Sequence, residues 1–184
     1  MRTLETDRLA IRAFTLDDGD IYSRLLDAAF GAESYGSSEE KRVMFEYQVA
    51  ADAGLALLHQ PPYGDRAIVL RSTREVIGSV GFAPCLAPFG QLPSFEVTPH
   101  FTPEVGLFWA LFPEHWGNGY ATEAAAAMIA HAFAELHLRR IVATTEHDNA
   151  RSISVMRRLG MRIEGNPRAE PAWLQTVGIL DNPT

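Results

Sequence analysis

Two periodicities of apolar and polar residues run through the first part of the chain. Residues 9–14 alternate apolar and polar side chains, as a half-buried strand does, and residues 15–18 supply a cap and an acidic first turn. A helix is therefore predicted directly after this strand, with Ile21, Leu25 and Ala28 facing inward.

A capping box predicts the start of a second helix. Ser37 is placed to accept a hydrogen bond from the backbone, and Glu40 is placed to reach back to it. This helix is expected to end before the two prolines at positions 61 and 62. The apolar positions at helical spacing are Val43, Met44, Tyr47 and Ala51.

The middle of the chain has the pattern of strands. Residues 67–70 and 76–82 are β-branched runs separated by a polar turn, which predicts an antiparallel hairpin. Residues 83–103 contain five prolines and a glycine, and we interpret them as a long excursion of the kind that usually lies over a site. Residues 104–112 form a further apolar strand, closed by Pro113, which has no N–H to donate to a sheet.

The remaining elements alternate between the two types, and Gly160 is expected to end the last helix as a left-handed cap. They are a helix over residues 121–136, a strand over 140–145, a helix over 149–159 and strands over 161–164 and 173–180. This order predicts a mixed sheet and a fold of the α/β class, of the α+β type, in one domain over residues 1–184.

Composition narrows the classes of partner. The chain has 184 residues, 47% of them hydrophobic, and a formal net charge of −7, which allows one full core but no basic surface for nucleic acid. Neither a secretory signal nor a run of about 18 apolar residues is present, so we expect a soluble protein without a membrane partner. A single cysteine, Cys85, suits a reducing cytoplasm; we interpret it as a small apolar loop residue, and no metal is expected.

The segment from Leu111 to Thr122 has the most informative chemistry. It reads as a strand, a tight loop with Gly117 and Gly119, and then the first turn of a helix. Helix N-termini present unpaired N–H groups, and glycines let the backbone approach an anion closely. A pyrophosphate fits such a loop.

Other interpretations of this loop are weaker. A Walker A loop needs a lysine, and the only lysine of the chain is Lys41. A dinucleotide fingerprint would need Thr122 as its third small residue and Glu135, inside a helix, as its acid. A purely structural turn remains open, because a lone Gly-x-Gly is a weak signal.

Four motifs in order resemble the GNAT superfamily of acyltransferases. Residues 116–121 are similar to its Gln/Arg-x-x-Gly-x-Gly/Ala loop, although Trp116 replaces the Gln or Arg. Residues 6–12, 149–152 and 158–161 resemble signatures of the subgroup that includes ribosomal-protein alanine N-acetyltransferases. The resemblance implies a single GNAT acyl-CoA N-acyltransferase fold, with a mixed and mostly antiparallel central sheet flanked by helices.

The resemblance also implies roles for individual residues. The N–H of Leu111 would face the thioester oxygen of acetyl-CoA, where attack by an amine places negative charge. Asn149 and Ser152 would hydrogen-bond the pantetheine arm. The pyrophosphate would be held by residues of the loop and first helical turn, namely Trp116, Gly117, Asn118, Gly119, Tyr120, Ala121 and Thr122.

Proton transfer needs separate candidates. Glu104 matches the glutamate that many family members use as a base toward the amine, and it is equally well read as a solvated strand end. The family often has a tyrosine that protonates the departing thiolate, but here that position is Met156, most simply a core residue. The role then falls to Ser152, Tyr120, water or no group. Weaker candidates for the base are Glu96, His100 and His147, each more simply surface or structural.

Three functions compete at this point. The first is an acetyl-CoA-dependent N-acetyltransferase that acts on a protein N-terminus or a small amine in a ternary complex. The second is an inactive acyl-CoA-binding sensor or scaffold, suggested by Met156, and the third is an oxidoreductase, which the hairpin disfavours. Apolar residues of the excursion fit an acceptor pocket, a homodimer contact or simple loop packing; they are Leu86, Phe89, Leu92, Phe95 and Phe101.

Overall fold

The strands of the computed structural model, which describes residues 1–32 and 34–183, form one sheet in the order β1-β2-β3-β4-β5-β6-β8-β7. The strands are β1 (Leu4–Glu5), β2 (Leu9–Ala13), β3 (Gly64–Leu70), β4 (Val76–Ala87), β5 (Thr102–Leu111), β6 (Arg140–Thr145), β7 (Arg162–Gly165) and β8 (Thr176–Asp181). The α-helices are α1 (Gly19–Phe30), α2 (Ser38–Leu57), α3 (Tyr120–Ala134) and α4 (Ala150–Arg158). Short 3-10 turns are η1 (Leu16–Asp18), η2 (Phe89–Gln91), η3 (Pro113–His115) and η4 (Ala172–Leu174).

The pairing of the strands confirms the predicted mixed, mostly antiparallel sheet. Antiparallel ladders join β1 to β2, β2 to β3, β3 to β4, β6 to β8 and β7 to β8. A parallel step joins β5 to β6, where Gly106 lies opposite Val142. The predicted hairpin is the β3–β4 pair, and only the two-residue strand β1 was not anticipated.

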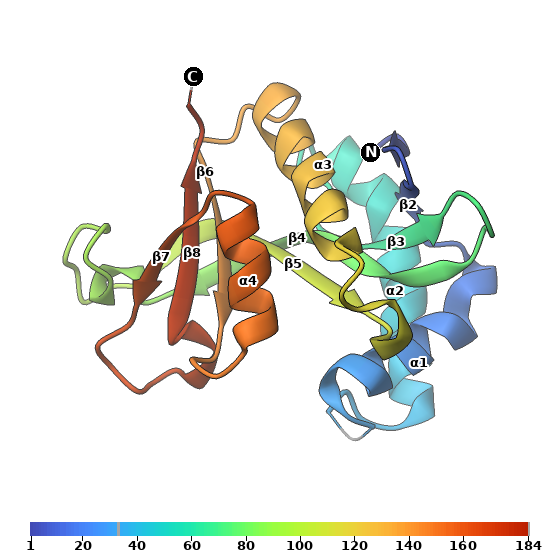
Figure 1. The fold of residues 1–184 in the computed structure, drawn as a ribbon, viewed down its shortest axis with the longest axis horizontal. Helices are drawn as coiled ribbons and strands as arrows, with labels where there is room; N and C mark the ends of the chain where they lie inside the picture. The colour runs from blue at the N-terminus through green and yellow to red at the C-terminus, as the bar shows by residue number, and fades with distance from the viewer. Residues whose placement is uncertain (33, 184) are drawn as a thin grey trace. The chain divides into compact units, whose positions relative to one another are not determined.

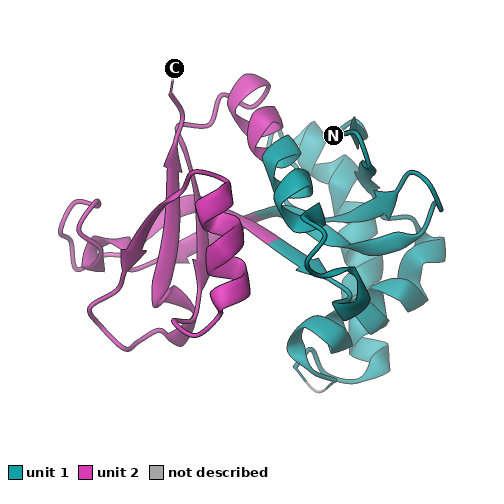
Figure 2. Ribbon diagram, viewed as in Figure 1, with its two compact units in different colours: residues 1–82, 109–128 teal, residues 83–108, 129–184 magenta. Residues whose placement is uncertain are grey.

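The chain divides into two compact units (Figure 2). Unit 1 comprises residues 1–82 and 109–128, and unit 2 comprises residues 83–108 and 129–184. Strands β4 and β5 and helix α3 each contribute residues to both units.

In unit 1, α1 and α2 lie on one face of β2 and β3, and the start of α3 lies on the other (Figure 1). The rings of Phe14, Tyr22 and Phe45 meet at centroid distances of 4.8 to 5.8 Å beneath β3. Such aromatic packing gives the small unit a large apolar contact area. The remaining members of this buried cluster are Leu26, Ala67 and Val69.

Helix α2 begins where the capping box predicted it, and two of the four apolar positions named at helical spacing, Met44 and Ala51, are partly buried. Ser37 accepts from the N–H of Glu40, while Val43 and Tyr47 are 54% and 74% exposed. The side chains that α2 buries instead include Lys41 and Phe45, one helical turn apart. The ammonium of Lys41 is paired with Asp27 and the carbonyl of Ala32, which allows a charged side chain to be buried.

In unit 2, the two faces of β8 pack against different partners. Val177 and Ile179 lie in an apolar cluster with Val142 of β6, and Gly178 lies against Met156 of α4. Met156 is 1% exposed, so its interpretation as a core residue is confirmed.

The excursion is shorter than the sequence suggested. Strand β4 continues to Ala87 and β5 begins at Thr102, so both strands take residues from the predicted loop. Phe89 and Leu92 are fully buried in the unit 2 core, whereas Leu86 and Phe101 are exposed. Packing therefore explains the first pair. Cys85 lies in β4 and not in a loop, because this strand extends past Phe82.

Candidate functional site

The predicted anion loop is built in unit 1 between the end of β5 and the start of α3. Pro113 opens the turn η3, and the N–H of Phe112 donates to the carbonyl of Ile77 on β4. The indole Nε1 of Trp116 donates to the carbonyl of Leu111 at 2.9 Å. Trp116, which replaces the Gln or Arg of the family motif, thus fastens the loop back onto the strand.

Two glycines shape the loop itself. Gly117 has a φ of 78° and Gly119 a φ of 81°, in the left-handed region that other residues adopt with strain. Between them, the side-chain amide of Asn118 donates to the carbonyls of His115 and Trp116 at 3.3 and 3.1 Å. The Gly-x-Gly pattern therefore has a conformational cause at both positions.

The loop leaves backbone donors available. Within the described residues, the N–H groups of Gly117, Asn118 and Gly119 donate to no protein acceptor. They lie directly before α3, where the positive end of the helix dipole also favours an anion. The geometry is suited to a phosphate or diphosphate.

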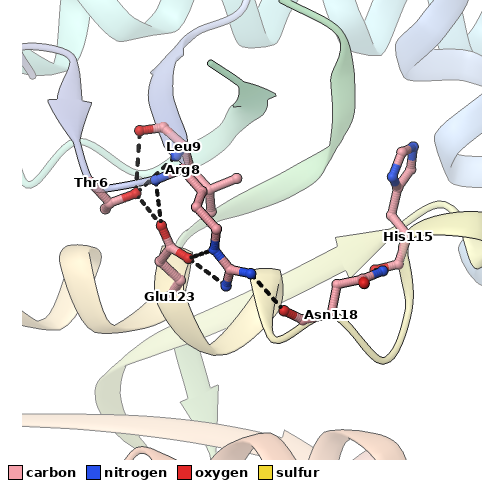
Figure 3. Close-up of polar contacts among 6 residues, drawn as sticks. All are labelled: Thr6, Arg8, Leu9, His115, Asn118 and Glu123. Atoms are coloured by element: carbon pink, nitrogen blue, oxygen red, sulfur yellow. Dashed lines mark hydrogen bonds and ion pairs between the residues drawn. The ribbon is translucent and has the colours of Figure 1, made fainter. Parts of the chain in front are cut away.

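The structure joins Glu123, which the sequence analysis did not consider, to Thr6 and Arg8 of the 6–12 motif. Glu123, in the first turn of α3, accepts from Thr6 and Arg8, and Arg8 also donates to the carbonyl of Asn118 (Figure 3). The guanidinium of Arg8 lies 4.6 Å from the centre of the Tyr120 ring. The motif around Arg8 was visible in the sequence, but its partner lies 115 residues away and no local pattern indicates the pairing.

The candidate base lies in unit 2. Glu104 is on β5, and Nη1 of Arg140 is 3.6 Å from its Oε1. Burial raises the pKa of Glu104 above its ordinary value, although the charges of Arg140 and Arg139 oppose this. Burial and the charge of Glu104 also raise the pKa of Cys85.

Asn149 and Ser152 are brought together in unit 2. Asn149 is the N-cap of α4, and its Oδ1 accepts from the N–H of Ser152 at 3.1 Å. The Asn-x-x-Ser pattern thus has a local structural reason, since it caps the helix.

The weaker candidates for the base have simple explanations. Glu96 and His100 are exposed. The ring of His147 is hydrogen-bonded to Thr176 at 3.1 Å. Among the described residues, no group of three or more His, Cys, Asp or Glu side chains is arranged to hold a metal ion. In the same part of the chain, no helix is both long and apolar enough to cross a membrane.

Comparison with known proteins identifies the family of this fold. The family model of the GNAT acetyltransferase domain matches residues 8–162, and the chain belongs to this family. It is 31% identical over 163 residues to YoaA, an uncharacterized N-acetyltransferase of Bacillus subtilis, covering 88% of this chain and 84% of that protein.

Solved structures agree with this assignment. An acetyltransferase from Agrobacterium tumefaciens matches with a TM-score of 0.71 and 26% identity, over 98% of this chain and 94% of that one. The fold is also shared by RimL, a ribosomal L7/L12 alpha-N-protein acetyltransferase in complex with coenzyme A. That match has a TM-score of 0.64 and 17% identity, over 97% and 96% of the two chains. The protein is an acyltransferase of the GNAT type.

Proposed function

We propose that the protein transfers the acetyl group of acetyl-CoA to a primary amine by direct attack in a ternary complex. The observation that carries this proposal is the set of free N–H groups at Gly117, Asn118 and Gly119, ahead of α3. A diphosphate is the part of acetyl-CoA that such a loop recognises. The coenzyme A complex of the related fold supports the same assignment.

The proposed cofactor contacts extend beyond these three amides. Trp116, Tyr120, Ala121 and Thr122 complete the diphosphate loop and the first helical turn. Asn149 and Ser152 contact the pantetheine arm; the Oδ1 of Asn149 is occupied by capping, so its Nδ2 is the donor for this contact.

The chemistry requires a neutral amine. We assign Glu104 as the base that removes the proton of the ammonium group, directly or through water. The amine nitrogen then attacks the thioester carbon, and the negative charge on the oxygen is stabilised by the N–H of Leu111, an effect of about 3 kcal/mol at comparable sites. As the intermediate collapses, the nitrogen gives its second proton to water, the C–S bond breaks, and coenzyme A leaves as its thiolate. A raised pKa of Glu104 makes this carboxylate a stronger base.

Protonation of the thiolate is the least demanding step. Met156 is buried and has no proton to donate. Ser152, Tyr120 or water supplies the proton, or the thiolate leaves unaided, because a thiol pKa of about 8.5 makes it a tolerable leaving group. The burial of Met156 also favours a second candidate function, an acyl-CoA sensor or scaffold without turnover.

The acceptor is a protein N-terminus or a small-molecule amine, and the net charge of −7 favours a cationic one. The exposed side chains of Leu86 and Phe101 provide apolar surface for an acceptor or for a second copy of the chain. The single Cys85 fits a reducing cytoplasm.

The test is calorimetric titration with acetyl-CoA, coenzyme A and NADH, followed by a thiol-release assay against a panel of amines and peptides. Micromolar binding of acetyl-CoA together with thiol release supports the acetyltransferase. Binding without release supports the sensor, and the absence of coenzyme A binding overturns both.

A further inference from the structure

The Gly-rich loop is fastened to the N-terminal segment through one carboxylate. Oε1 of Glu123 accepts from Oγ1 of Thr6 at 2.5 Å and from the N–H of Arg8 at 3.0 Å. Oε2 of Glu123 accepts from Nε and Nη2 of Arg8, both at 2.6 Å. The remaining guanidinium nitrogen, Nη1, donates to the carbonyl of Asn118 at 3.0 Å (Figure 3). We call Thr6, Arg8 and Glu123 the clamp.

The clamp is held in an ionised state. Partial burial opposes ionisation of Glu123, but the hydrogen bonds from Thr6 and Arg8 outweigh it and hold the pKa of this carboxyl below its ordinary value. Charge-assisted hydrogen bonds of this kind are among the strong hydrogen bonds of proteins. The clamp is therefore formed at neutral pH.

Four carbonyls of the loop, those of His115, Trp116, Asn118 and Gly119, accept hydrogen bonds from protein donors. Arg8 holds the carbonyl of Asn118, and the N–H of Glu123 holds that of Gly119 at 3.0 Å. The side-chain amide of Asn118 holds the carbonyls of His115 and Trp116.

This arrangement sets the direction of the free amides. In a planar trans peptide, the N–H of one residue points opposite to the carbonyl of the residue before it. Holding the Asn118 carbonyl therefore aims the N–H of Gly119 the other way, and holding the Trp116 carbonyl does the same for Gly117. Both glycines are intrinsically free to rotate, so these bonds restrict the peptides that a ligand would need in place.

We propose that Arg8 and Glu123 are positioning residues that preorganise the loop amides to bind the diphosphate of acetyl-CoA. This inference rests on the proposed function. It assigns to the N-terminal segment a part in cofactor affinity without direct contact with the cofactor.

The sign of one substitution separates this role from simple electrostatics. Glu123 is a negative charge beside an anion site, so Coulomb repulsion alone predicts that Glu123→Gln binds acetyl-CoA more tightly. The clamp predicts weaker binding, because glutamine has one acceptor oxygen in place of two and turns an amide donor toward Arg8. Glu114→Gln is the matched control. Glu114 is an exposed carboxylate in η3, and its substitution removes one negative charge beside the same loop, as Glu123→Gln does.

The experiment measures the Kd of acetyl-CoA for both variants by calorimetry. We expect Glu123→Gln to weaken binding about tenfold to a hundredfold, and Glu114→Gln to leave it unchanged or slightly tighter. With an acceptor from the amine panel, KM for acetyl-CoA should rise in Glu123→Gln while kcat stays within about twofold, a split that general loss of structure does not produce.

A second pair of variants tests Arg8. Arg8→Met should weaken acetyl-CoA binding, and the double variant with Glu123→Gln should be no weaker than either single one, because both remove the same clamp. Arg42→Met is the control: Arg42 has similar exposure, 54% against 48% for Arg8, and it pairs with Glu39 and Glu46 within α2, so the same charge is removed without a change to the clamp.

The outcomes are distinguishable. Wild-type protein that binds no acetyl-CoA overturns the proposed function itself. Wild-type binding with an unchanged or tighter Glu123→Gln variant overturns the clamp and leaves the proposed function in place. Additive losses in the double variant would also contradict a shared clamp.

Discussion

Glu104 is the residue on which the proposed chemistry depends. Glu104→Gln keeps the shape of the side chain but removes its basicity, so we expect turnover to fall by about 100-fold or more. The Kd of acetyl-CoA should change little, because the base acts on the amine and not on the cofactor. Steady-state kinetics and calorimetry on the same preparation test this, and unchanged turnover across pH removes Glu104 from the mechanism.

Arg140 lies beside the proposed base, Glu104. It lies 3.6 Å from Glu104, is held by Asp181 and covers the ring of Phe95. Arg140→Gln removes the main charge that lowers the pKa of Glu104, so that pKa should rise further. A base is active when deprotonated, so the acidic limb of the kcat/KM profile should move to higher pH. Arg162→Gln, which also pairs with Asp181, should leave the limb in place.

The buried carboxyl of Asp65 predicts that the free energy of unfolding depends on pH. Burial raises its pKa to about 6, although the hydroxyl of Tyr22 lowers it somewhat. A carboxyl whose pKa is raised by folding is destabilising once it ionises, so stability from this group is lost as pH rises through about 4 to 6. Asp65→Asn should therefore stabilise the protein by about 1 to 3 kcal/mol at pH 7.5 and much less at pH 4.5. Denaturant unfolding at both pH values checks this, and an equal effect at both would contradict it.

At the scale of elements, local sequence motifs predicted the ends of helices correctly, but apolar periodicity did not predict which side chains are buried. The capping box at Ser37 and the left-handed Gly160 both follow from backbone geometry within a few residues, and both are present. On α2, Val43 and Tyr47 are exposed, whereas Lys41 is buried with Asp27 of α1 as its partner. Periodicity alone contains no information about such partners.

The close approach of β4 and β5 in unit 1 depends on Gly78. A Cβ there would lie 2.2 Å from the carbonyl oxygen of Ala110 and 2.5 Å from a methyl of Leu111. Gly78→Ala should therefore separate the strands next to Leu111 and destabilise the fold by about 2 kcal/mol or more. Gly165→Ala, at a strand glycine with open space, is the control and should be nearly neutral. Thermal unfolding of the two variants makes the comparison, and equal melting temperatures would count against the close approach.

At the scale of the whole molecule, the family could be predicted because four motifs occur in the right order along the chain. The glycines of the loop were recognisable, since their conformation is a local requirement. The clamp could not be recognised in the sequence, because Arg8 and Glu123 are far apart along the chain and come into contact only in the folded protein. The extension of β4 to Ala87 was not predicted, because prolines in this segment are typical of loops.

Ligand binding should be visible in the stability of the whole chain. If acetyl-CoA binds the folded state alone, a concentration of 100 times Kd adds about 2.7 kcal/mol to the free energy of unfolding. For a chain of this size the melting temperature should then rise by about 5 to 10 °C. NADH at the same concentration should cause no shift. A shift with NADH and none with acetyl-CoA would reverse the assignment.

The sequence separation within the clamp has a consequence for synthesis. Thr6 and Glu123 are 117 positions apart, so a ribosome releases the N-terminal segment long before its partner emerges. When the Gly-rich loop leaves the ribosomal exit tunnel, Thr6 and Arg8 have therefore already emerged. The clamp can therefore be completed only after Glu123 has emerged and α3 has met Thr6 and Arg8.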